Sequence, residues 1–176
     1  WKRQGHGSLD LVGALRHSCN VYFYKLAERI GMDPILTAAT ELGFGETAGL
    51  SIGPEVSGVL PVDDYCRERK YWIDERGRKR RLSCTLGDAV NASIGQGFVT
   101  VTPYQLGLAY ARIASGRRIE PRIVRRVVAH DTREVVSYTD ENPPKLNFKR
   151  EHLDLVREGL LQVVNDPKGT AYSAFY

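Results

Sequence analysis

The sequence lacks the short motifs that mark several enzyme classes. It contains no Gly-x-Ser-x-Gly elbow, no Walker phosphate-binding loop, no His-Glu-x-x-His helix and no Cys-x-x-Cys pair. None of its serines is followed three residues later by lysine. The four histidines are scattered, and each taken singly indicates a surface or packing residue rather than a catalytic base. A search by motif therefore does not identify a nucleophile within the chain.

Long apolar runs are also scarce, and no signal peptide opens the chain. The longest uncharged run, residues 89–111, contains Asn91, Gln96, Pro103 and three glycines, so it predicts a buried loop and the start of a helix rather than a membrane span. The sequence begins with Trp1 and not with Met. We therefore expect a fragment whose targeting segment and membrane anchor lie elsewhere.

Charge of one sign is not in excess over most of the chain. The net charge of +4 comes from 25 basic and 21 acidic residues. Between Arg67 and Arg81 there are eight basic and three acidic residues, which gives +5 and leaves −1 for the rest. This distribution predicts one local basic loop and no general attraction to nucleic acid. The length of 176 residues and the 42% hydrophobic content suit one globular domain, or a large piece of one.

Cysteine is rare, and its count of three is odd. Cys66 and Cys84 bracket the basic run, which makes residues 66–84 an excursion from the rest of the chain. If the two cysteines were oxidised, they would close a loop of about 18 residues and contribute roughly 3 kcal/mol in a chain-entropy account. Two ordinary free thiols explain the same spacing, so the sequence leaves both states open.

Helical periodicity appears in four places. Apolar residues at spacings of three and four from Leu11 to Ile30 predict a helix capped by Ser8, either continuous or broken near Ser18. Asp33 and Pro34 predict the N-cap and the first-turn proline of a second helix.

The rest of the chain predicts two further helices, one from a capping box at Thr102 to Gly116 and an amphipathic one from near Arg150. It also predicts a loop at 43–61, a surface hairpin or mobile loop at 66–84, and a β-hairpin at 123–129 and 134–138.

The tripeptide Ser18-Cys19-Asn20 lies within the first periodic stretch. Ser and Asn side chains compete for backbone hydrogen bonds and so favour a local helix break. They would also present a hydroxyl and an amide on a rigid support. Taken alone, the tripeptide favours the helix break.

The surrounding segments give this tripeptide a context, because together they resemble the class B penicillin-binding proteins of the cell-elongation type. The similarity includes Gly5-His6-Gly7, Ser18-Cys19-Asn20 and, most strongly, Ser93-Ile94-Gly95-Gln96-Gly97. The matching segments follow the family's order over nearly all 176 residues. They are residues 1–7, 14–24, 42–45, 57–61, 91–97, 101–106 and 164–172.

The resemblance implies an α/β (α+β) penicillin-binding protein/β-lactamase-like transpeptidase fold, of which this chain supplies mostly the helical lobe and a β-hairpin. It implies a peptidoglycan D,D-transpeptidase that cross-links stem peptides through a serine acyl-enzyme and reacts with β-lactams. Residues 1–176 would be a partial domain that lacks the Ser-x-x-Lys and Lys-[Ser/Thr]-Gly motifs, with 66–84 as a basic insertion. The implied location is the periplasmic face of the cytoplasmic membrane, beside a membrane glycosyltransferase and without nucleic acid.

The resemblance also assigns roles to individual residues. Ser18 and Asn20 match the family's second motif, whose hydroxyl relays a proton and whose amide binds the substrate. The chemistry requires no cofactor. Some elongation-type members bind a zinc through two Asp, one His and one Cys, and His6 and Cys19 match the last two ligands. A packed thiol beside an unrelated histidine is the alternative.

Three other functions remain open from the sequence. The first is a division-type peptidoglycan synthase, although the Gly-His-Gly segment and the Ser-Cys-Asn variant favour elongation. The second is a non-catalytic scaffold of the cell-wall machinery. The third is a nucleic-acid-binding module that uses the basic run 67–81, whose binding would weaken steeply with added salt.

Overall fold

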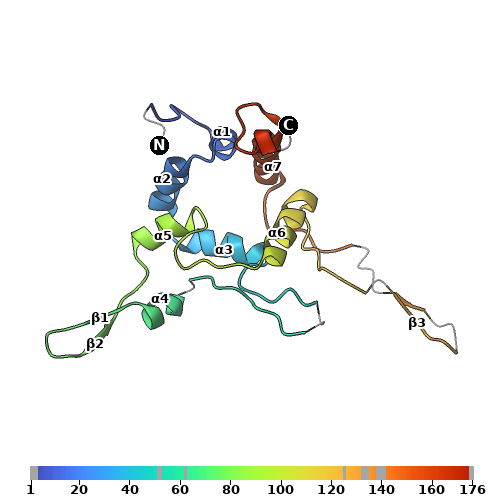
Figure 1. Ribbon diagram of the computed structural model, residues 1–176, viewed down its shortest axis with the longest axis horizontal. Helices are drawn as coiled ribbons and strands as arrows, with labels where there is room; N and C mark the ends of the chain where they lie inside the picture. Colours follow the sequence, from blue (N-terminus) through green and yellow to red (C-terminus); the bar gives the residue numbers. More distant parts are fainter. Residues whose placement is uncertain are drawn as a thin grey trace.

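The computed structural model describes residues 4–50, 53–61, 63–124, 126–131, 135–137 and 142–174. Within them, six helices form a ring when seen down the shortest axis, and two β-hairpins project from the side opposite the two chain ends (Figure 1). The helices are α1 (Leu11–Arg16), α2 (Asn20–Ile30), α3 (Asp33–Glu41), α4 (Asp63–Arg69), α5 (Leu86–Ala92), α6 (Pro103–Ser115) and α7 (Arg150–Asn165), of which α4 lies outside the ring; a short 3-10 turn, η1 (Tyr172–Ala174), follows α7.

Helices α1 and α7 form the closest seam of the ring, although they lie at opposite ends of the sequence. Gly159 is buried on α7, and a Cβ placed there would come within 2.5 Å of Leu15 on α1. Ala14, fully buried on α1, is also a small residue. The seam therefore depends on small residues that let the two backbones approach closely.

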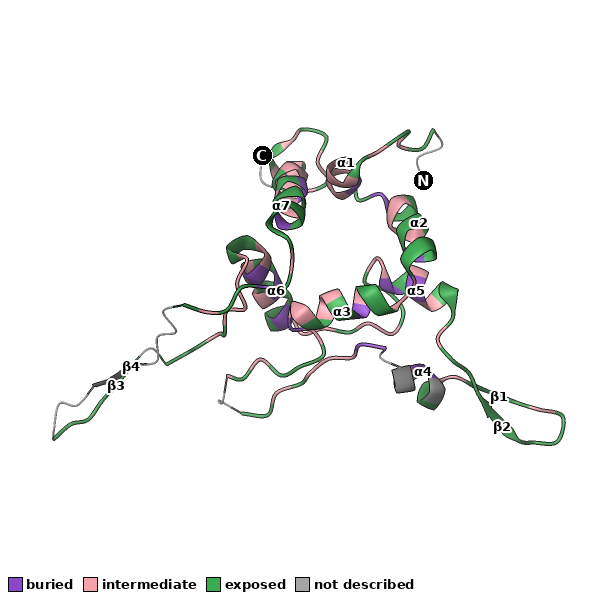
Figure 2. Ribbon diagram, turned by 180° about the vertical axis from the view of Figure 1, so that it is seen from behind, coloured by how far each residue is buried: buried purple, intermediate pink, exposed green. Residues whose placement is uncertain are grey.

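The hairpins are antiparallel and short. Strand β1 (Tyr71–Ile73) pairs with β2 (Lys79–Arg81), and β3 (Arg126–Val128) pairs with β4 (Val135–Ser137). Every residue of β1 and β2 is exposed, and both strands are green in Figure 2. A disulfide joins Cys66 and Cys84 at its base, with their Cα atoms 5.1 Å apart. Residues 66–84 are thus a hairpin whose two ends are joined by a disulfide, and not a mobile loop.

Gln105 fixes the loop before α4 to the start of α6. Its side chain is 1% exposed, and its amide donates hydrogen bonds to the carbonyl oxygens of Glu46 (2.7 Å) and Ser57 (2.8 Å). Its amide oxygen accepts from the backbone N–H of Thr102, while the Thr102 hydroxyl accepts from the N–H of Gln105. The predicted capping box is confirmed, and the same glutamine also donates to two carbonyls of the loop.

Most of the predicted elements are confirmed, and the differences have local causes. The stretch from Leu11 to Ile30 is two helices broken near Ser18, one of the two predicted possibilities. The cap of the first helix is Asp10 and not Ser8, because the Asp10 carboxylate accepts from the N–H of Gly13 at 2.7 Å. Helix α5, whose second half lies in the run 89–111 that was expected to begin as a buried loop, was not predicted. The turn predicted at 131–133 falls largely outside the described residues. Among the described residues, no helix is long and apolar enough to cross a bilayer.

Candidate active site

Ser18 occupies the tight turn between α1 and α2. Its φ of +48° is the only positive value at a non-glycine residue in the described part of the chain. The N–H of Ser18 donates to the carbonyl of Leu15, and the N–H of Cys19 donates to that of Ala14. These two bonds define a Schellman motif, in which the left-handed position usually holds glycine. A serine there costs about 1–2 kcal/mol of backbone strain, which points to a need for the side chain.

The hydroxyl of Ser18 contacts a segment 152 residues further along the chain. Its Oγ lies 3.0 Å from Oγ1 of Thr170, and either hydroxyl can be the donor. The backbone N–H of Thr170 donates to the carbonyl of Arg16, and the Arg16 guanidinium forms an ion pair with Asp166 at 2.8 Å. The loop 166–170 is therefore fastened to the end of α1, where it holds a hydroxyl against Ser18.

Asp166 keeps its charge in this arrangement. The backbone N–H of Lys168 donates to its carboxylate at 2.7 Å, and this bond, followed by the hydrogen bond from Arg16, lowers the pKa of Asp166 below its usual value. The carboxylate therefore remains ionised at neutral pH, and the ion pair with Arg16 persists there.

Two cavities meet at the turn. The central cavity, about 730 Å³, lies inside the ring and is lined mainly by apolar side chains, such as Phe23 of α2, Leu36 of α3 and Leu106 of α6. The second, about 420 Å³, is lined by residues 5–7, Ser18–Val21 and Tyr24; we call it the His6–Cys19 cavity. Ser18 and Asn20 line both. The predicted site residues are thus brought together at one junction.

His6 and Cys19 both face the His6–Cys19 cavity. Cys19 is a buried free thiol, and the His6 ring stacks on that of His17 with centroids 5.3 Å apart. An imidazole and a thiolate are suitable donors for zinc, but a tetrahedral site needs four ligands. Among the described residues, no group of three or more His, Cys, Asp or Glu side chains could hold a metal. The two residues could therefore supply at most two of the four ligands.

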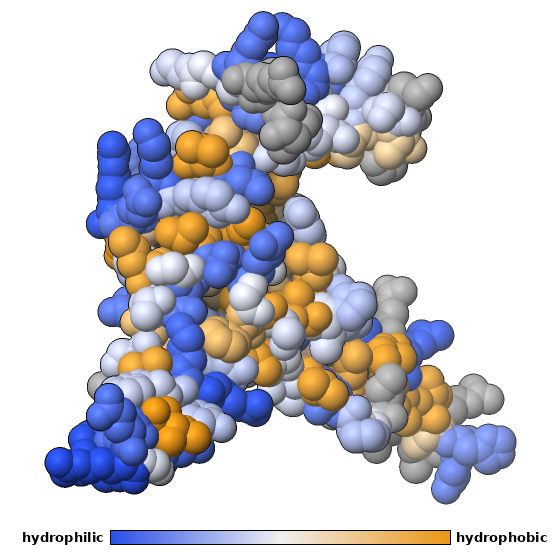
Figure 3. All heavy atoms as spheres, turned by 60° about the vertical axis from the view of Figure 1, so that its left-hand side comes forward, coloured by the Kyte–Doolittle hydropathy of each residue, from blue (hydrophilic) through white to orange (hydrophobic). Residues whose placement is uncertain are grey.

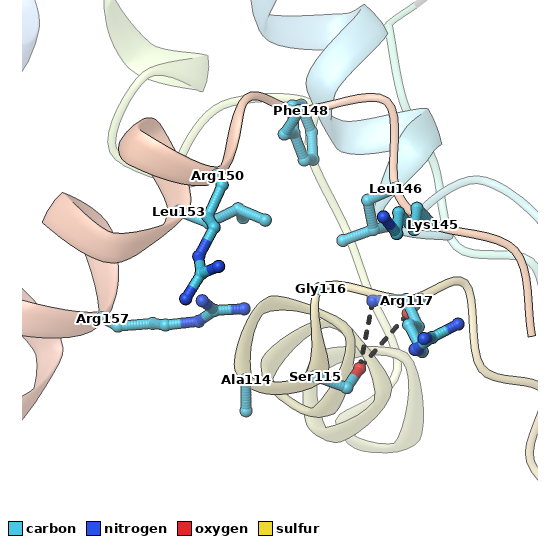
Figure 4. A pocket seen from close by; sticks show the side chains of 10 residues that line it. All are labelled: Ala114, Ser115, Gly116, Arg117, Lys145, Leu146, Phe148, Arg150, Leu153 and Arg157. Atoms are coloured by element: carbon cyan, nitrogen blue, oxygen red, sulfur yellow. Dashed lines mark hydrogen bonds between the residues drawn. The ribbon is translucent and has the colours of Figure 1, made fainter.

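A third cavity lies between the end of α6 and the start of α7 (Figure 4). Two of the arginines that line it form hydrogen bonds within the protein. Arg157 donates to the carbonyl of Ile113 and pairs with Asp154, while Arg117 donates to the carbonyl of Pro143. None of the predicted site residues lines this cavity. Its cationic groups hold α6, α7 and the preceding chain together.

Thr170 and Arg16 were missed as part of the site. Residues 164–172 and 14–24 were both recognised as segments shared with a family, but neither segment shows by itself that the two are in contact. The one available signal was the small, polar Asp166-Pro167-Lys168-Gly169-Thr170 loop. Gly169 has no room for a side chain, because an added Cβ would overlap the carbonyls of Gln162 and Val163.

Curated relatives align with this chain over all or nearly all of its length. The peptidoglycan D,D-transpeptidase MrdA of Salmonella typhimurium strain SL1344 is 30% identical over 179 residues, which cover 100% of this chain and 27% of that protein. MrdA of Escherichia coli K12 is 27% identical over 99% of the chain and 26% of its own length. The chain thus spans about a quarter of the length of these relatives.

The fold is shared with solved structures as well. The penicillin-binding protein PBP2 of Helicobacter pylori, in complex with MreC, matches with a TM-score of 0.73 and 29% identity, over 99% of this chain and 29% of that one. The predicted transpeptidase-type α/β fold is confirmed by this similarity. Residues 1–175 match the family described as the penicillin binding protein transpeptidase domain. The chain therefore belongs to the penicillin-binding protein transpeptidase family.

Proposed function

We propose that this chain is the helical part of a peptidoglycan D,D-transpeptidase that acts in cell elongation. The observation that carries the proposal is the hydroxyl of Ser18, presented by a strained left-handed turn at the junction of two cavities. The names of the MrdA relatives support the same activity and the elongation type. No observation favours a division-type synthase, and the excess of basic charge is confined to residues 67–81.

In the proposed reaction, a serine outside this chain attacks the carbonyl carbon of the terminal D-Ala–D-Ala bond. The serine must lose a proton, and the departing amine must gain one. Ser18 Oγ can accept a proton from one side while it donates its own to the other, so it relays the proton without forming a covalent bond itself. The amide of Asn20, two residues away, binds the acyl side of the substrate.

The contact with Thr170 suits this role. A relay hydroxyl must keep one rotamer, because a proton passes only along an aligned hydrogen bond. Thr170 offers Ser18 an oxygen at 3.0 Å from a loop that the Arg16–Asp166 ion pair fastens in place. Thr170 is thus a positioning residue for Ser18.

The remaining proposals follow from the family. The substrates are peptidoglycan stem peptides, and β-lactams acylate the same serine. The protein would be anchored in the cytoplasmic membrane, act on its periplasmic face, and assemble with a membrane glycosyltransferase. The Helicobacter relative forms a complex with MreC, which supports membership of an elongation assembly.

Covalent labelling tests the activity. The full-length protein that contains this chain should react with a fluorescent penicillin, and an excess of an unlabelled β-lactam should prevent the labelling. The label should map to a Ser-x-x-Lys serine that precedes Trp1. A folded protein that takes up no label, or that lacks this motif, would be the non-catalytic scaffold.

We also propose that His6 and Cys19 supply two of four ligands to a structural zinc, the other two coming from outside this chain. Metal analysis of the full-length protein should find about one zinc per chain, and Cys19→Ser should lose it. The double variant Cys66→Ser/Cys84→Ser is the matched control and should keep the metal, because it removes a disulfide whose cysteines lie outside the cavity. A wild-type protein without zinc would reject the site.

A further inference from the structure

The hairpin of residues 70–82, which we call the basic arm, has no part in the proposed catalytic site. Its base is fixed by the Cys66–Cys84 disulfide and by an ion pair between Lys70 and Asp88 at 2.5 Å. Burial alone would raise the pKa of Asp88, but hydrogen bonds from Lys70 and Thr85 outweigh it and lower that pKa. The arm is therefore a rigidly rooted projection that extends away from the ring of helices (Figure 1).

The charge of the basic arm is exposed and only partly compensated. Six basic and two acidic residues lie between 70 and 82, a net charge of +4. Asp74 is occupied within the arm, since it accepts hydrogen bonds from the backbone N–H groups of Arg76 and Arg78 and from the guanidinium of Arg78. The side chains of Arg78 and Arg80 are nevertheless more than half exposed.

Apolar side chains of the same arm are exposed as well. Tyr71, Trp72 and Ile73 are 49%, 53% and 63% exposed, and Lys79 lies over the Tyr71 ring at 3.8 Å from its centroid. In Figure 3 the arm is a lobe of mostly hydrophilic surface with an apolar patch. Exposed aromatic residues on a projecting segment indicate that something covers them in use.

The pairing of the strands decides what can cover the arm. Each apolar residue of β1 lies directly opposite a basic residue of β2: Tyr71 opposite Arg81, Trp72 opposite Arg80 and Ile73 opposite Lys79. Both faces of the ribbon therefore combine apolar and cationic groups, and neither face could be buried in a dry protein interface without burying charge. A layer of lipid headgroups accepts both, because aromatic rings enter the interface while long cationic side chains reach the phosphates.

We propose that the basic arm binds the surface of an anionic phospholipid bilayer and so orients the domain relative to the membrane. The disulfide limits the freedom of the arm before binding, which lowers the entropy that contact would cost. The inference rests on the proposed location beside a membrane and not on the transpeptidase reaction. If the arm did not bind the membrane, labelling of the protein by penicillin would be unaffected.

Hydrogen exchange of the full-length protein in nanodiscs tests this proposal. Amides of the arm should exchange about tenfold more slowly in discs containing phosphatidylglycerol than in discs of phosphatidylcholine alone. The difference should vanish between about 0.1 M and 1 M salt, as the Debye length falls from about 10 Å to about 3 Å. Equal exchange in the two kinds of disc would overturn the proposal.

Charge-reversal variants separate the arm from the overall charge. Arg76→Glu/Lys79→Glu/Arg81→Glu should abolish the protection, and thiol titration should show that the disulfide is intact. The matched control Arg126→Glu/Lys145→Glu/Lys149→Glu changes the net charge equally at other exposed positions and should keep the protection. If a soluble DNA duplex protects the wild-type arm as strongly as anionic discs do, the arm binds nucleic acid and the lipid proposal fails.

Discussion

Replacing Ser18 with glycine should slow acylation of the full-length protein by a fluorescent penicillin by about 10²–10⁴-fold, the usual effect of losing a proton-transfer group. Glycine removes the hydroxyl, and it also suits the φ of +48° better than serine does. The variant should therefore be as stable as the wild type, or more stable by about 1 kcal/mol. Stopped-flow labelling and a thermal unfolding curve measure the two effects.

The comparison of Ser18→Gly with Ser18→Ala makes the test specific. Both variants lack the hydroxyl, so their acylation rates should fall by the same factor. Only the alanine variant retains the strain of the left-handed turn. Ser115→Ala is the control, because its hydroxyl bonds only within the end of α6 and the chain just beyond it. An unchanged acylation rate in Ser18→Gly would remove the relay role from Ser18.

The largest effect on stability is expected at Gln105. Gln105→Leu should lower the free energy of unfolding by about 3–5 kcal/mol, because it leaves the carbonyls of Glu46 and Ser57 and the N–H of Thr102 without their partner. Denaturant unfolding of the full-length protein measures the change. Gln105→Glu should destabilise the protein at least as much as Gln105→Leu, because its carboxylate would be buried against two carbonyl oxygens to which it cannot donate.

Gln162→Leu provides the control for this experiment. The Gln162 amide bonds only to Glu158 on the same exposed face of α7. Its loss should change the free energy of unfolding by less than about 0.5 kcal/mol. Equal effects at the two glutamines would show that the loop carbonyls find other partners.

Sequence patterns predicted the elements whose signals are local. The start of α6 follows from Thr102, Pro103 and Gln105, three residues that share one turn, and its end follows from Gly116. The start of α1 was placed at Ser8 instead of Asp10, because both are good caps and only the folded chain shows which one accepts the N–H of Gly13. Helix α5 was missed because its seven residues are too few for a clear apolar stripe and glycines follow closely.

The candidate site depends on contacts that no local pattern encodes. The tripeptide Ser18-Cys19-Asn20 was singled out by resemblance, and whether the helix broke there stayed open until the turn was seen. The contact of Ser18 with Thr170 joins two segments separated by 152 residues, and it exists because α1 packs on α7. Such pairings arise from tertiary packing, which a single sequence does not reveal.

If β-lactams acylate the full-length protein as proposed, the fastening of the loop 166–170 to the end of α1 has a consequence for drug resistance. A substitution at Thr170 or Asp166 would change the orientation of the Ser18 hydroxyl, although these positions lie about 150 residues from the tripeptide and the tripeptide itself is unchanged. Susceptibility to an antibiotic could then drift while the sequence around the motif looks intact. Surveys of clinical variants that read only the signature tripeptides would overlook such changes.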